Sequence, residues 1–206
     1  MPRQERAIAT REKLVEAAGQ VFASMHFETA RVADILKASS VTQGAFYFHF
    51  PEGKKQIAAL IIERQNNRFV QLRDGVSGSN LDGLSGLLEL ADLLGHLLQS
   101  DPITQAGIRL VTQSSTLFPD VAHLPDPTWL EAISAYLYRA EGEGNLRSDV
   151  DISLSARTIV YLFTGAQVSS FVNDSWEQLP YALATIEPYV LQALAVDGFT
   201  PTRGSE

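Results

Sequence analysis

Apolar residues recur at three- and four-residue spacings along most of the chain, and this pattern predicts helices. The first such segment, residues 6–25, has about five turns of amphipathic pattern. Its apolar positions are Ala7, Ile8, Leu14, Val15, Ala18, Val21 and Phe22. The chain contains no alternation typical of a strand, no internal repeat and no low-complexity tract. The expected fold class is therefore all-α.

The same periodicity and the turn signals between segments divide the chain into nine expected helices. Their ranges are 6–25, 31–38, 42–48, 54–73, 81–99, 103–115, 128–141, 152–173 and 176–196. Between the fourth and the fifth, the stretch DGVSGSN at 74–80 predicts a Gly/Ser loop. We expect three parts: a three-helix head at 1–53, a helical body at 54–200 that begins with a connecting helix at 54–73, and a disordered tail at 201–206.

Composition limits the chemistry and the location of the protein. Among its 206 residues there is no cysteine, which excludes disulfides, thiolate metal sites and cysteine nucleophiles. The N-terminal residues lack the apolar segment of a secretory signal, and no apolar run reaches the ~20 residues that span a bilayer. We expect a cytoplasmic protein.

Charge is distributed unevenly along the chain. The segment through Arg73 holds eleven basic and seven acidic residues, a net charge of +4, whereas the remainder carries −12. A basic head on an acidic body indicates a polyanionic partner for the head alone, although +4 is also compatible with an ordinary protein surface.

Two short expected helices joined by a tight turn, followed by a long helix, form the layout of a helix-turn-helix unit. In such a unit the second short helix enters the major groove with its N-terminal residues. Here these are Thr42, a good N-cap, and then Gln43, Gly44 and Ala45. The Gln43 amide suits adenine, and the small residues allow close approach of the helix to DNA.

Aromatic residues dominate the rest of this helix. Tyr47 and His49 carry polar groups suited to phosphate oxygens. Phe46, Phe48 and Phe50 are expected to hold the helix against the core.

Residues 27–50, FETARVADILKASSVTQGAFYFHF, and the preceding REKLVEAAGQVFA resemble the DNA-binding head of the tetracycline-repressor (TetR) family of bacterial regulators. The resemblance implies a homodimeric repressor that binds pseudo-palindromic, double-stranded operator DNA. It implies base contacts from Gln43 and Gly44, and phosphate contacts from Tyr47, His49 and a lysine that opens the long helix.

Two departures from the family pattern affect this assignment. Ala30 stands where the family has a capping threonine, so either Thr29 caps the helix and contacts a phosphate instead, or that phosphate contact is missing; the adjacent Arg31 is a further candidate for DNA contact. The corner PEGKK is one residue longer than usual, so Lys54 and Lys55 are both candidates for the lysine contact.

The body is similar to the γ-butyrolactone-receptor branch of the family, through Trp129 and the stretch NLRSDVDISLSARTIVYLFTG that follows it. This resemblance implies a small effector of butyrolactone, butenolide or furan type that binds at Trp129 and releases the DNA. Further candidate contacts are Gln65, Thr164, Tyr161 and Gln105. Alternatively, Gln65 is solvated, Thr164 bonds to its own helix and Trp129 fills the core.

Other classes of function remain open at this point. The sequence contains no HExxH, GxxxxGK[ST] or GxSxG motif, and no cofactor or metal is expected. An all-α enzyme with dispersed site residues and a helical adaptor that binds only proteins are the alternatives. The long apolar helices near the C-terminus predict a homodimer joined through these helices, although burial within one subunit explains them nearly as well.

Overall fold

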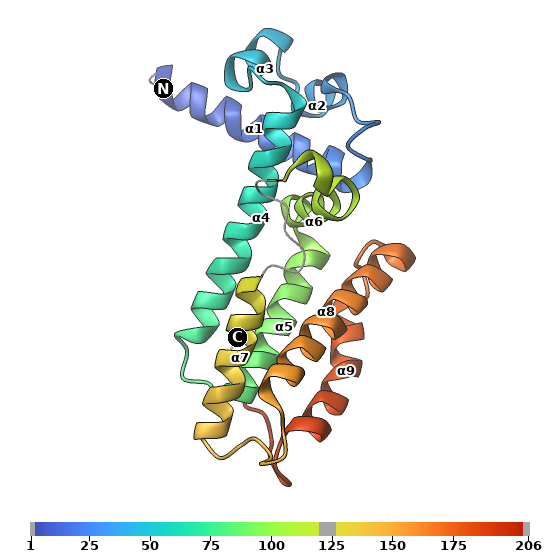
Figure 1. Ribbon diagram of the computed structural model, residues 1–206. Coiled ribbons are helices and arrows are strands. Elements are labelled where there is room, and N and C mark those ends of the chain that lie inside the picture. The colour runs from blue at the N-terminus through green and yellow to red at the C-terminus, as the bar shows by residue number, and fades with distance from the viewer. Residues whose placement is uncertain (1–2, 120–126, 204–206) are drawn as a thin grey trace. The chain divides into compact units, whose positions relative to one another are not determined.

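The computed structural model describes residues 3–119 and 127–203. These residues form nine α-helices and one short 3₁₀ helix, with no strand beyond an isolated bridge between Leu146 and Ala195, which confirms the all-α prediction (Figure 1). The helices are α1 (Arg3–Ser24), α2 (Val32–Ser39), α3 (Gln43–His49), α4 (Lys54–Ser77), α5 (Gly83–Ser100), α6 (Pro102–Ser114), η1 (Ser115–Leu117), α7 (Pro127–Gly142), α8 (Ile152–Asp174) and α9 (Leu179–Leu194). Within the described ranges, no helix combines the length and the apolar character needed to cross a membrane.

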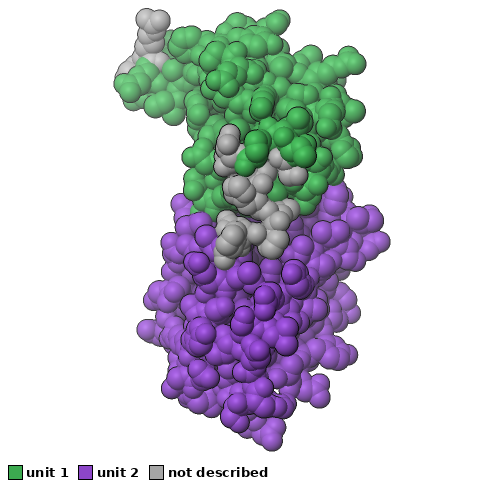
Figure 2. All heavy atoms as spheres, viewed as in Figure 1, with its two compact units in different colours: residues 1–68, 101–124 green, residues 69–100, 125–206 purple. Residues whose placement is uncertain are grey.

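The chain divides into two compact units (Figure 2). The first unit comprises residues 1–68 and 101–124, and the second comprises residues 69–100 and 125–206. This division differs from the boundary expected at residue 53. The first part of α4 and all of α6 belong with α1, α2 and α3, because α6 packs along α1.

The first unit is built around a core shared by α1, the two short helices, α4 and α6. Its largest fully buried side chains are Leu14, Phe22, Ile35, Phe46, Phe50, Ile57, Ile61 and Ile62. A bidentate ion pair joins α4 to α1, with Arg64 donating to both carboxylate oxygens of Glu12 at 2.7 Å. Because the Arg64 guanidinium favours the charged carboxylate, the pKa of Glu12 lies below its usual value.

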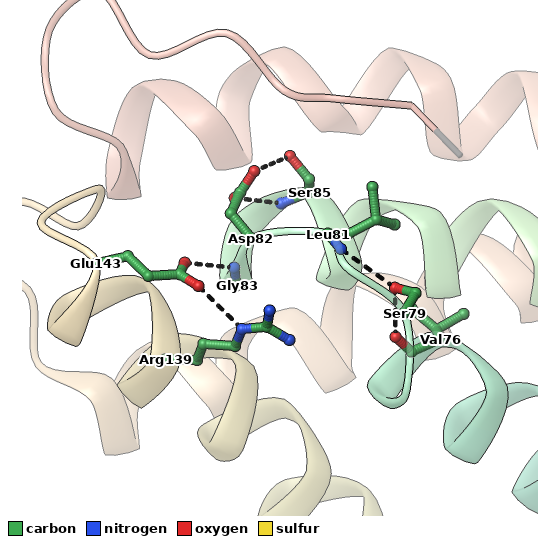
Figure 3. Close-up of polar contacts among 8 residues, drawn as sticks. All are labelled: Val76, Ser79, Leu81, Asp82, Gly83, Ser85, Arg139 and Glu143. Atoms are coloured by element: carbon green, nitrogen blue, oxygen red, sulfur yellow. Dashed lines mark hydrogen bonds and ion pairs between the residues drawn. The ribbon is translucent and has the colours of Figure 1, made fainter. Parts of the chain in front are cut away.

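In the second unit, α5 packs on α7 and α9, and α8 packs on both of those helices. The N-terminus of α5 crosses α7 at very short range. A Cβ atom on Gly83 would lie 2.4 Å from both the Ala140 nitrogen and the Tyr136 carbonyl oxygen, so only glycine allows this approach. The Glu143 carboxylate accepts a hydrogen bond from the Gly83 amide at 2.7 Å and another from Arg139 at 2.9 Å (Figure 3).

Several boundaries differ from the sequence prediction; α1, for example, begins at Arg3 rather than at residue 6, and α5 begins at Gly83 rather than at residue 81. The helix α4 continues through Ser77, into the expected loop. The last helix begins at Leu179 rather than at residue 176. Residues 201–203, expected in a disordered tail, contact α5 and α9 within the second unit: the Thr202 amide donates to the Ser85 hydroxyl at 2.8 Å, and Arg203 pairs with Glu187 at 2.5 Å. The remainder of that tail, residues 204–206, lies outside the described residues.

Candidate functional site

The turn between α2 and α3 has the form that the sequence predicts. Ser40 ends α2 in the left-handed conformation with φ of 54°, and the Val41 amide donates to the Ser39 hydroxyl at 3.3 Å. Thr42 then caps α3, because its hydroxyl accepts a hydrogen bond from the Ala45 amide at 3.4 Å. These contacts define the orientation in which α3 leaves α2.

The N-terminal turn of α3 presents small and polar groups to solvent. Thr42, Gln43 and Gly44 are exposed, and Ala45 is half-buried. A side chain at Gly44 would meet no atom within 4 Å, so the helix backbone is open to an approaching surface here. Farther along the helix, Tyr47 is exposed and His49 is half-buried.

Contrary to the sequence prediction, the phenylalanines of α3 are not all buried. Phe46 and Phe50 are buried, with ring centroids 5.8 Å apart, and they hold α3 on the core. Phe48, in contrast, is 76% exposed, so the prediction that it anchors the helix is wrong. Successive helix residues are rotated by about 100°, and two steps from Phe46 therefore place Phe48 on the opposite face.

The structure distinguishes the two lysines at the start of α4. The Lys54 ammonium donates to the Phe27 carbonyl at 2.5 Å and to the Ala30 carbonyl at 2.8 Å, and lies 4.2 Å from the centre of the Phe27 ring. Partial burial lowers the pKa of Lys54, an effect opposed by nearby Glu28. The neighbouring Lys55 is exposed. Lys54 therefore connects α4 to the segment between α1 and α2, whereas Lys55 faces solvent.

At the start of α2 the cap is Arg31 and not Thr29, the residue considered from the sequence. The Arg31 amide donates to the Asp34 carboxylate at 2.8 Å, which caps the helix at Arg31. The Thr29 hydroxyl instead donates to the His26 carbonyl at 3.1 Å. The side chains of Thr29 and Arg31 are both exposed.

Two candidate effector contacts lie in the first unit. Gln65 of α4 is only 2% exposed, so it is not a solvated residue. Its side chain packs against Gly107 of α6, where an added Cβ would lie 2.5 Å from the Gln65 Cβ. Gln105 of α6 is half-buried.

The other three candidates lie in the second unit. Trp129 of α7 is partly exposed and packs edge-on against Phe69, with 5.8 Å between ring centroids. The Thr164 hydroxyl donates to the Val160 carbonyl of its own helix at 2.8 Å, as the alternative interpretation expected. Tyr161 is 64% exposed.

A surface hollow of about 300 Å³ lies between the C-terminal part of α4 and α7. Arg73, Ser77, Glu131, Tyr136 and Arg139 are among its lining residues, but none of the candidate effector contacts is. Burial raises the pKa of the Tyr136 hydroxyl, while nearby Arg139 and Arg73 oppose this change. Trp129 is not among the lining residues, so the hollow is distinct from the surface that the Trp129 ring offers.

Tyr161 belongs to a narrow apolar strip along α8. The sequence prediction does not identify this strip. We define the α8 strip as Leu154, Tyr161, Gly165, Val168 and Val172, all of them exposed. At about 100° per residue, these five positions fall within about 40° of one line along the helix. The buried residues Ile152, Ala156, Gln167 and Ser170 lie on the opposite side of α8. A signal was present in the sequence, since residues 158–173 contain no charged side chain.

Comparison with known proteins identifies the family. Residues 82–195 match the family described as tetracyclin repressor-like, C-terminal domain. The A-factor receptor protein of Streptomyces griseus is 29% identical over 96% of this chain and 68% of its own length. The structure of a gamma-butyrolactone receptor (ArpA-like protein) has a TM-score of 0.77 at 27% identity, covering 92% of this chain and 90% of that one. The TetR family protein CprB from S. coelicolor A3(2) has a TM-score of 0.78 at 26% identity, covering 93% and 91%. The chain therefore belongs to the tetracyclin repressor-like (TetR) family.

Proposed function

We propose that this protein is a cytoplasmic, homodimeric transcriptional repressor that leaves its operator DNA when it binds a small molecule of γ-butyrolactone, butenolide or furan type. The observation that carries the proposal is the outer surface of α3, where small and polar residues are exposed above the buried Phe46 and Phe50. Similarity to an A-factor receptor and a gamma-butyrolactone receptor supports the effector class. These relatives do not favour the enzyme or the adaptor alternative.

In this proposal α3 enters the major groove. Gln43 makes the paired donor and acceptor contact that suits adenine, beside Thr42, Gly44 and Ala45. Phosphate contacts come from Tyr47, His49, Lys55, Thr29 and Arg31. Two copies of α3 in a dimer would contact half-sites about 34–36 Å apart, or a multiple of that distance.

The second copy of the chain would pack against the α8 strip. Isolated exposed apolar residues are normal on a protein surface, but four exposed apolar side chains aligned opposite the buried face of α8 favour a partner there. Gly165 adds a second argument, since a side chain there would meet no atom within 4 Å and another helix can approach closely. We therefore assign Tyr161 to this dimer surface rather than to the effector.

Trp129 remains the principal proposed effector contact, because its partly exposed ring offers a flat apolar surface. Thr164 remains a candidate in the same unit, and Gln65 and Gln105 remain separate candidates in the first unit. An effector changes DNA occupancy only through its different affinities for the two protein conformations. Shifting the ratio of the two conformations from 99:1 to 1:99 requires a difference of about 5.5 kcal/mol between the effector's binding free energies for them.

Fluorescence anisotropy on DNA from upstream of the protein's own gene tests this function. We expect tight binding that weakens steeply with salt, because each neutralised phosphate releases counterions. A synthetic γ-butyrolactone should release wild-type protein, whereas Trp129→Ala should still bind DNA and fail to respond. If Trp129→Ala loses DNA binding in parallel with its melting temperature, the ring is a core residue. If butyrolactones, butenolides and furans all leave DNA binding unchanged, the proposed effector class is wrong. If the protein selects no sequence from a random duplex library, the proposed repressor function is wrong.

The two lysines at the start of α4 should respond differently to substitution. Lys55→Ala should weaken binding to all DNA sequences similarly and reduce the salt slope by about one per lost phosphate contact. Lys54→Met should leave the salt slope unchanged and lower the unfolding free energy by ~1–3 kcal/mol, because it removes charge-assisted hydrogen bonds to two carbonyls. Anisotropy at four salt concentrations and urea unfolding measure both effects. A flattened slope in Lys54→Met, with no change in Lys55→Ala, would reverse the assignment.

A further inference from the structure

Phe48 has the largest exposed fraction of any large apolar side chain among the described residues, at 76%. Its ring lies edge-on to the ring of the adjacent His49, with centroids 5.0 Å apart and an interplanar angle of 81°. An aromatic residue in this position does not stabilise the head by burial. Its exposure on the helix proposed to enter the major groove therefore requires another explanation.

The position of Phe48 on α3 indicates what it faces. Phe48 and Gly44 are four residues apart, so they share one face of the helix, opposite the buried Phe46 and Phe50. Long side chains on a helix point back over the preceding turn. Gly44, one turn before Phe48, has no side chain, and a Cβ placed on it would meet no atom within 4 Å, so the surface beside Phe48 on this face is open. The result is an apolar patch on the outermost face of α3, next to the polar Gln43.

We propose that Phe48 is a specificity-determining residue that contacts the C5-methyl group of a thymine in the operator, an inference that rests on the proposed function. A phenyl ring offers no hydrogen-bond donor to a phosphate, so it is unsuited to backbone positioning. In the major groove the apolar group that distinguishes one base from the others is the thymine methyl, and phenylalanine is a suitable partner for it. Each half-site would then contain an adenine contacted by Gln43 and a thymine contacted by Phe48.

Replacing operator thymines with deoxyuridine tests the proposal, because this removes the methyl group and preserves base pairing. The operator is first selected from a random duplex library with wild-type protein, and each thymine is then replaced in turn, symmetrically in both half-sites. For wild type, one position should lower affinity by about four-fold per half-site, the factor expected for one methyl group removed from apolar contact. Phe48→Ala removes the methyl contact in both half-sites, so it should bind the intact operator at least about sixteen-fold more weakly, and deoxyuridine at that position should have no further effect.

Ile8→Ala provides the matched control, because Ile8 is also a strongly exposed apolar residue of the first unit but lies on α1. It should retain the wild-type response to deoxyuridine. Phe48→Ala should keep the wild-type melting temperature, since the exposed ring contributes little packing. An equal deoxyuridine effect in wild type and Phe48→Ala, or no effect at any thymine in wild type, would overturn the inference while leaving DNA binding established. Failure of wild type to select any sequence would overturn both the inference and the proposed function.

Discussion

Replacing Tyr161 and Val172 together with glutamate should convert the dimer into folded monomers. Both side chains are on the α8 strip and are largely exposed, so the substitutions remove little packing within one subunit. Across a dimer, however, the carboxylates would be buried without partners, which is strongly unfavourable. The two heads would then bind DNA independently, and affinity for the full operator should fall by roughly 10²–10⁴-fold.

Sedimentation velocity measures the oligomeric state, and anisotropy on full operators and isolated half-sites measures the effect on DNA binding. Affinity for a half-site should be similar in wild type and variant, because α3 is unchanged. Ser153→Glu and Asn173→Glu are matched controls, since both residues are exposed on α8 about 100° from the strip. A double variant that remains dimeric would show that a different surface joins the subunits.

Much of the first unit could be predicted from local sequence signals. The three- and four-residue spacings identified α1 and α2, and Thr42 marked the start of α3 because capping is a local interaction. The sequence prediction is wrong for Phe48, because it gives all three phenylalanines of α3 the same inward orientation. A helical wheel places Phe48 about 200° from Phe46, so the information was present in the spacing.

Features that depend on contacts distant in sequence could not be predicted. Lys54 bonds to carbonyls that precede it by 24 and 27 residues, and this pairing decides which lysine faces solvent. Similarly, α6 belongs to the first unit because it packs on α1, although some 80 residues separate the two helices. Gln65 is buried because Gly107, on another helix, leaves room for its side chain.

At Trp176 the sequence prediction was wrong for a conformational reason. The tryptophan was expected to begin the last helix, but Ser175 and Trp176 have φ values of 57° and 70°. Two consecutive left-handed residues that are not glycine are strained, at a cost of order 1–3 kcal/mol each. This strain persists because it directs the indole ring into the core of the second unit, where Trp176 is only 2% exposed.

Trp176→Ala should therefore lower the free energy of unfolding by about 3–5 kcal/mol, the range for removal of a large buried aromatic side chain. The indole Nε1 donates to the Gln167 carbonyl at 3.0 Å, and the ring packs on Phe171 with centroids 4.6 Å apart. The first contact connects the α8–α9 turn to the side of α8 opposite the α8 strip, and the second connects it to a position about 100° from the strip. Their loss should also weaken the dimer.

Urea unfolding at one fixed protein concentration measures this effect, because dimerisation makes stability depend on concentration. Trp176→Phe keeps much of the ring packing but removes the Nε1 donor, so it should fall between wild type and Trp176→Ala. Ser175→Gly should stabilise the protein by roughly 1 kcal/mol, because glycine adopts the left-handed conformation without strain. A loss of less than about 1 kcal/mol in unfolding free energy for Trp176→Ala would be no more than an ordinary surface substitution causes. It would show that packing of the indole does not maintain the left-handed conformation of Ser175 and Trp176. Stabilisation by Ser175→Gly together with destabilisation by Trp176→Ala would instead show that packing of one side chain offsets the backbone strain beside it.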